Sequence, residues 1–123
     1  MPFNQNPEFS IEEPYDPSSR YRVFISGADN FAGAIVDGEF VIFNALNPSN
    51  TNVPLDPLPS EIEITSRVGV GSTITLMVMD WGVKANAAAE IRWGSSLENS
   101  RQVDIGGPTK MEFLLRYGIF RLV

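Results

Sequence analysis

Several side chains in one stretch of the sequence have the residue types of a ligand-binding site. The only two tryptophans, Trp81 and Trp93, are each followed by glycine, and they lie beside acidic, amide and basic residues. An exposed indole could stack on the C–H face of a sugar ring while these polar groups bond its hydroxyls. The predicted carbohydrate site consists of Asp80, Trp81, Asn86, Glu90, Arg92 and Trp93.

The same indoles could instead belong to the hydrophobic core, which is the default place for tryptophan in a domain of this size. The carbohydrate interpretation requires that residues 81 and 93 flank a connection between adjacent strands. Both rings would then line one edge of a sheet. The sequence leaves both interpretations open.

Missing residue types exclude several kinds of chemistry. The chain has no histidine and no cysteine. A Ser-His-Asp triad, a thiol nucleophile and the ordinary zinc sites are therefore excluded. The segment Gly69–Thr73 is too short for a phosphate-binding loop and lacks its lysine, so it predicts a tight turn. We expect no cofactor.

Carboxylates alone could still support hydrolysis, and Asp80 and Glu90 are the best pair because each lies near a tryptophan. A calcium site would need several acidic side chains close together in a loop. The segments around Asp29 and Asp37 contain too few of them. We therefore expect no metal site and no enzyme. A carboxylate-dependent hydrolase is the third of three functional hypotheses.

The charge pattern bears on partners and location. Net charge is −6, and the nine Lys and Arg residues are scattered. Nucleic acid and anionic membranes require concentrated positive charge, so neither is an expected partner. No apolar run reaches the roughly 18 residues of a membrane helix, so membrane insertion is not expected. The N-terminus lacks the pattern of a signal peptide, which predicts a protein that is cytoplasmic or released without a classical signal.

The elements that would position the site have the patterns of strands. Residues 20–26 alternate, with Tyr21, Val23 and Ile25 on one face. Asp37-Gly38 lies between two runs rich in β-branched and aromatic residues, which predicts a hairpin with a type I′ turn. Residues 61–68 alternate as a further strand, and residues 72–81 are apolar on both faces, as in a central strand buried on both sides.

The remaining segments are less regular. Residues 45–60 contain four prolines and predict a long loop. Residues 84–90 have local helix propensity and predict a short turn of helix or a loop. Short strands are expected at 89–94 and 101–106. The periodicity of residues 110–123 suits either a helix or a strand; the aromatic content and Gly118 favour a strand with a bend or bulge at the glycine.

About eight short strands at roughly 8–12-residue spacing predict an all-β fold. We expect an antiparallel two-sheet sandwich of jelly-roll or immunoglobulin-like type. Residues 20–123 would form this single domain. Residues 1–19, which contain four prolines, would form an extended N-terminal arm.

The favoured functional hypothesis is a non-catalytic, lectin-like carbohydrate-binding protein that acts as a homo-oligomer. The alternative is a structural self-assembling subunit, such as a virion or filament protein, whose N-terminal arm contacts neighbouring copies. Apolar side chains on both faces of the predicted strands support self-association, although a two-layer core would also account for them. They include Phe40, Ile42, Met77, Met79, Phe120 and Leu122.

Overall fold

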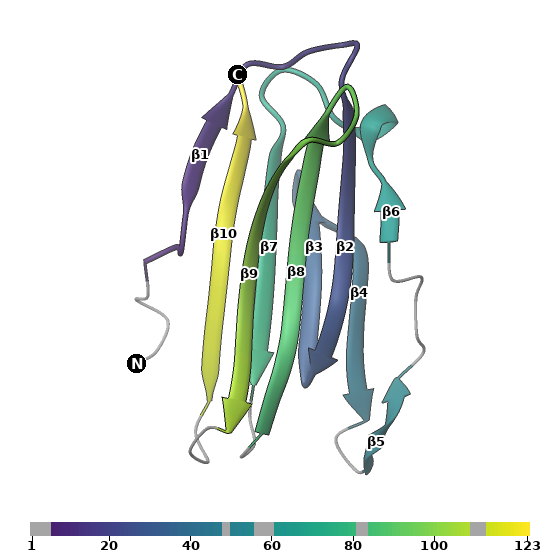
Figure 1. Cartoon of the computed structure of the whole chain (residues 1–123), viewed down its shortest axis with the longest axis vertical. Helices are drawn as coiled ribbons and strands as arrows, with labels where there is room; N and C mark the ends of the chain where they lie inside the picture. The colour runs from purple at the N-terminus through teal and green to yellow at the C-terminus, as the bar shows by residue number, and fades with distance from the viewer. Residues whose placement is uncertain (1–5, 48–49, 56–60, 81–83, 109–112) are drawn as a thin grey trace.

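The protein consists of two β-sheets packed face to face, which confirms the predicted sandwich (Figure 1). The computed structural model describes residues 6–47, 50–55, 61–80, 84–108 and 113–123. Sheet A has the order β1 (Ser10–Glu13), β10 (Leu114–Leu122), β7 (Thr73–Asp80), β3 (Phe31–Val36), β4 (Glu39–Asn47) and β5 (Asn50–Leu55). Sheet B has the order β6 (Glu61–Glu63), β2 (Arg20–Asp29), β8 (Lys84–Gly94) and β9 (Asn99–Pro108). Whether the sandwich is of jelly-roll or immunoglobulin-like type stays a prediction.

The core lies between the sheets because alternate side chains of each strand point inward. On β7 the inward residues Ile74, Leu76 and Val78 are fully buried, and on β2 Tyr21 and Val23 are almost fully buried. Sheet B contributes two small core residues, Ala87 and Ala89, from the middle of β8. The predicted inward face of residues 20–26 is confirmed.

The hairpin between β3 and β4 has the geometry that its sequence predicts. Val36 pairs with Glu39 across the turn, so Asp37 and Gly38 are the two loop residues. Their φ angles are 49° and 88°, as a type I′ turn requires. The carboxylate of Asp37 accepts hydrogen bonds from Ser72 Oγ and Thr73 N, each at 3.0 Å, which ties the turn to the start of β7.

Part of the predicted N-terminal arm is a strand of sheet A. β1 pairs with β10, and this pair is parallel. The ring of Phe9 occupies the space where a Cβ on Gly118 would lie, so glycine at this position makes room for the docked segment. The register of β10 with β7 runs from Leu114 to Arg121 without a shift, and Gly118 therefore marks a close approach and not a bulge.

Three segments differ from their sequence-based predictions. The strand predicted at 61–68 is only β6, followed by a 3-10 helix, η2 (Thr65–Arg67). The helical turn or loop predicted at 84–90 is instead part of β8. The predicted loop at 45–60 contains the end of β4 and the whole of β5, while residues 48–49 and 56–60 lie outside the described residues.

No helix in the described part of the chain is both long enough and apolar enough to cross a membrane.

Candidate functional site

The outer face of sheet A is apolar across its four middle strands. Inward residues on these strands alternate with outward ones, and the outward ones are half-buried or exposed in this chain. Cross-strand register places them in rows, for example Tyr117 beside Met77, and Leu115 beside Met79 and then Phe31. We call this surface the apolar face; its side chains are Phe31, Ile35, Phe40, Phe43, Thr75, Met77, Met79, Leu115, Tyr117 and Ile119.

Three phenylalanines form one end of the apolar face. The ring of Phe31 lies 5.8 Å from that of Phe40 and 6.0 Å from that of Phe43, measured between centroids. A Cβ on Gly33 would lie 3.0 Å from the Phe31 ring and 3.1 Å from Phe43 Cβ, so the rings close over this glycine. Phe40 is nevertheless 51% exposed. The cluster therefore presents aromatic surface outward.

No described strand or helix forms a further layer over the apolar face. Every described strand belongs to one of the two sheets, and η2 contacts β2 of sheet B. No described side chain in the three central rows of these four strands carries a charge. Charged residues lie at the margin: Glu8, whose N–H donates to the Tyr117 carbonyl, Glu12 and Arg121. A contiguous apolar surface of this kind is typical of an interface with another molecule.

The outer face of sheet B has the opposite character. Its charges are paired: Arg20 with Glu63 at 2.7 Å, and Arg92 with Glu90 at 3.0 Å. The guanidinium of Arg92 also lies 4.5 Å from the centroid of the Phe24 ring. The hydrogen bond from Arg20 lowers the pKa of Glu63. Such a face is well suited to contact with water, whereas the apolar face is not.

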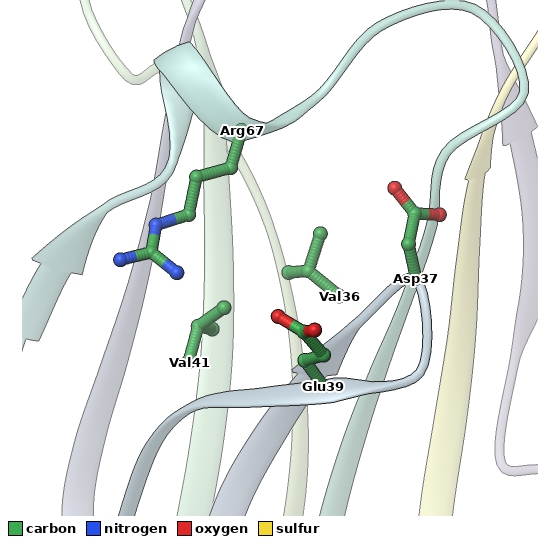
Figure 2. Close-up of a pocket in the computed structure, with 5 residues that line it drawn as sticks. All are labelled: Val36, Asp37, Glu39, Val41 and Arg67. Atoms are coloured by element: carbon green, nitrogen blue, oxygen red, sulfur yellow. The ribbon is translucent and has the colours of Figure 1, made fainter.

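A small pocket lies between the β3–β4 turn and η2 (Figure 2). It has a volume of about 280 Å³ and is lined by Val36, Asp37, Glu39, Val41 and Arg67. Arg67 extends from η2 on one side, and the two acidic residues belong to the hairpin on the other. Since the lining includes no aromatic ring and Asp37 serves the turn, this pocket is the weaker of two candidate ligand sites.

A larger cavity lies at the end of the sandwich where β1 ends, β2 begins and β8 turns into β9. We call it the end cavity. Its volume is about 370 Å³, and its wall includes two core aromatic residues, Tyr21 and Trp93. Three carboxylates line it: Glu13 and Asp16 from the end of β1 and the connection after it, and Glu98 from the β8–β9 turn. This cavity combines apolar surface with hydrogen-bonding groups, as small-molecule sites do.

Hydrogen bonds hold two of these carboxylates in their charged form. Asp16 Oδ1 accepts from Ser18 Oγ at 2.7 Å and from Ser18 N at 2.9 Å, and these bonds lower the pKa of Asp16. Glu98 Oε2 accepts from Ser96 N at 2.8 Å, which is the main cause of the lowered pKa of Glu98. Glu98 also lies over Gly94, whose φ is 119°, so it closes the β8–β9 turn.

The lowered pKa makes the contribution of Glu98 to stability depend on pH. A carboxyl whose pKa is lower in the folded state stabilises the protein above its unfolded value, here about 4.5, and loses that effect as the pH falls. We expect Glu98→Gln to lower the free energy of unfolding at pH 7 by more than at pH 3. Urea denaturation at both pH values measures this. Glu39→Gln, on the exposed hairpin, is the control; an equal loss at both pH values for Glu98→Gln would contradict the assignment.

The five described residues of the predicted carbohydrate site are divided between the core and the outer face of sheet B. Asp80 is fully buried on the inner face of sheet A, and Trp93 is 6% exposed in the core. Asn86, Glu90 and Arg92 point outward from sheet B, and only the last two make contact. Trp81 lies outside the described residues.

Asp80 and Glu90 lie on different faces of different sheets, so the carboxylate pair considered for hydrolysis does not face a common substrate. Groups of three or more His, Cys, Asp or Glu residues that could hold a metal ion are not found in the described part of the chain.

Sequence reasoning missed both the end cavity and most of the apolar face. Met77, Met79 and Phe40 were recognisable as apolar residues on second faces of strands, and these three do lie on the apolar face. Ile42, Phe120 and Leu122, identified by the same pattern, are core residues. Apolar residues at both odd and even positions show that a strand has two apolar faces, but they do not show which face packs against the other sheet.

Comparison of the chain with protein-family models, with curated proteins and with solved structures finds no match. What supports a function is therefore the arrangement of this chain's own side chains.

Proposed function

We propose that this protein is a non-catalytic assembly subunit whose apolar face packs against the same face of a second copy. The observation that carries the proposal is the run of apolar, uncharged rows on the outer side of the four middle strands of sheet A. The outer face of sheet B differs, because it carries Arg–Glu salt bridges, as is usual for a surface in contact with water. The contrast between the two faces favours a protein partner for sheet A.

The size of the face predicts a weak dimer. Four middle strands spaced about 4.8 Å apart, with rows spanning about 20 Å, give a surface of roughly 19 by 20 Å. Two copies would bury roughly 800 Å², below the range of roughly 1,200–2,000 Å² for stable, specific protein interfaces. The dimer is therefore expected to form only at high protein concentration, and its affinity to depend on good packing.

Self-complementarity favours a second copy as the occupant. Two identical twisted sheets can pack with their strands nearly aligned, as the two sheets of a sandwich do. A two-fold axis is the commonest symmetry of homodimers, and it sets the same patch against itself. The central rows carry no described charge, so charged side chains such as Glu8 and Glu12 lie only at the margin of this contact.

Sedimentation velocity over a range of concentrations and salt tests the proposal. We expect a monomer–dimer equilibrium whose dimer fraction rises between 50 mM and 500 mM salt. Each copy carries a net charge of −6, and salt screens this repulsion while leaving apolar contact intact. A protein that remains monomeric at 1 mM would refute the proposal, and a dimer that dissociates in salt would place the contact on a charged surface instead.

A further inference from the structure

The end cavity offers a second function that does not depend on self-association. It lies at the end of the sandwich, beside the C-terminal end of β1 and the β8–β9 turn, and not on the outer face of sheet A (Figure 1). Its lining comes from two parts of the chain that are distant in sequence, residues 13–21 and 93–99. A ligand here would leave the apolar face free.

The inner wall of the cavity is rigid and aromatic. Trp93 packs on Phe120 with ring centroids 4.6 Å apart, and Tyr21 stacks on Tyr15 at 6.3 Å. Both Tyr21 and Trp93 belong to the hydrophobic core. Rings held in this way can offer apolar contact to a ligand without losing side-chain freedom on binding.

Tyr21 supplies a buried hydrogen-bond donor at this wall. The residue is 1% exposed, and its hydroxyl oxygen accepts the N–H of Asp16 at 3.4 Å. No described residue accepts the hydroxyl proton of Tyr21. The Tyr21 hydroxyl thus keeps a proton that it can donate to a ligand oxygen in the cavity.

The other polar groups of the cavity are chiefly acceptors. Glu13, Asp16 and Glu98 provide carboxylate oxygens, and Asp16 and Glu98 are fixed by their bonds to Ser18 and Ser96. Carboxylates need donors from a ligand, whereas the Tyr21 hydroxyl needs an acceptor. Hydroxyl groups do both. An ammonium group only donates, and an anionic group would meet three negative charges.

We infer that the end cavity binds a neutral polyhydroxylated ligand, with the dimensions of one saccharide unit. Its hydroxyls accept from Tyr21 and donate to Asp16 and Glu98, and its C–H groups contact the edge of Trp93. Asn99, which also lines the cavity, can donate and accept. This site shares only Trp93 with the carbohydrate site that the sequence predicts.

Intrinsic fluorescence provides the test. In a Trp81→Phe variant Trp93 is the only indole, and it lines the cavity. We expect glucose, galactose, mannose or their disaccharides to change its emission saturably at millimolar concentration. Tyr21→Phe, which removes only the hydroxyl, should weaken the affinity about 3–10-fold. Gln102→Ala, on the outer face of sheet B, should leave it unchanged.

Calorimetric titration of the unmodified protein with the same sugars measures binding without any substitution, so the test does not depend on the folding of the Trp81→Phe variant. The inference is overturned if neither method detects a neutral sugar at 50 mM. It is also overturned if only lysine or methylamine binds, which would show a cation site, or if Tyr21→Phe binds as tightly as wild type. A monomeric variant that still binds sugar would show that this site and the proposed dimer are independent.

Discussion

Met77→Lys is expected to abolish the proposed dimer and leave a monomer. Met77 is on β7, a middle strand of sheet A, with Tyr117 on one side and Gly33 on the other. A two-fold contact would bury two new ammonium groups without partners. Burying each unpaired charge costs several kcal/mol, so the dissociation constant should rise at least about 100-fold.

The same substitution should leave the fold almost unchanged. The Met77 side chain points away from the core, and lysine is also flexible and unbranched. Circular dichroism and the midpoint of thermal unfolding, measured at a concentration where wild type is monomeric, would show this. Sedimentation at high concentration would show the loss of the dimer.

Gln102→Lys is the matched control for Met77→Lys. It introduces the same side chain on an exposed position of β9, on the outer face of sheet B. It should dimerise like wild type. If both variants dissociate, added positive charge and not burial at the apolar face would explain the effect; if neither does, the apolar face is not the contact.

The predictable parts of the fold are those that local chemistry determines. Asp37-Gly38 specifies its hairpin because few other residue pairs accept positive φ at both positions. Alternation located β2 and its buried face, from Tyr21 to Ile25. These signals come from neighbouring residues and need no knowledge of the rest of the chain.

The Ala-rich segment of β8 shows where local chemistry is overridden. Alanine favours helix in isolation, but Ala87 and Ala89 are fully buried between the sheets of this sandwich. Pairing with β2 on one side and β9 on the other supplies hydrogen bonds along the whole strand. Tertiary pairing therefore decides the conformation, and single-sequence propensity does not include it.

The central strand β7 explains why the apolar face was predicted only in part. Its sequence is apolar on both sides, and it does lie in the middle of sheet A. Burial on both sides was nevertheless wrong, because Met77 and Met79 are half-exposed in this chain. The composition of a strand buried on both faces can also belong to a strand whose second face meets another molecule.

Trp93→Ala is expected to destabilise the protein by about 3–5 kcal/mol, as large-to-small substitutions of buried aromatic residues do. The indole is 6% exposed and packs against Phe120 with centroids 4.6 Å apart. A loss of this size is a large part of the roughly 5–15 kcal/mol that stabilises an ordinary domain. Urea denaturation followed by far-ultraviolet circular dichroism measures it without relying on the indole that is removed.

Asn86→Ala provides the comparison on the same strand, because Asn86 points outward from β8 and is exposed. It should change the free energy of unfolding by no more than about 0.5 kcal/mol. If Trp93→Ala were as mild as Asn86→Ala, the ring would not belong to the core. If it is as severe as expected, lost sugar binding in Trp93→Ala would report a damaged core, and Tyr21→Phe becomes the substitution that tests the end cavity without emptying it.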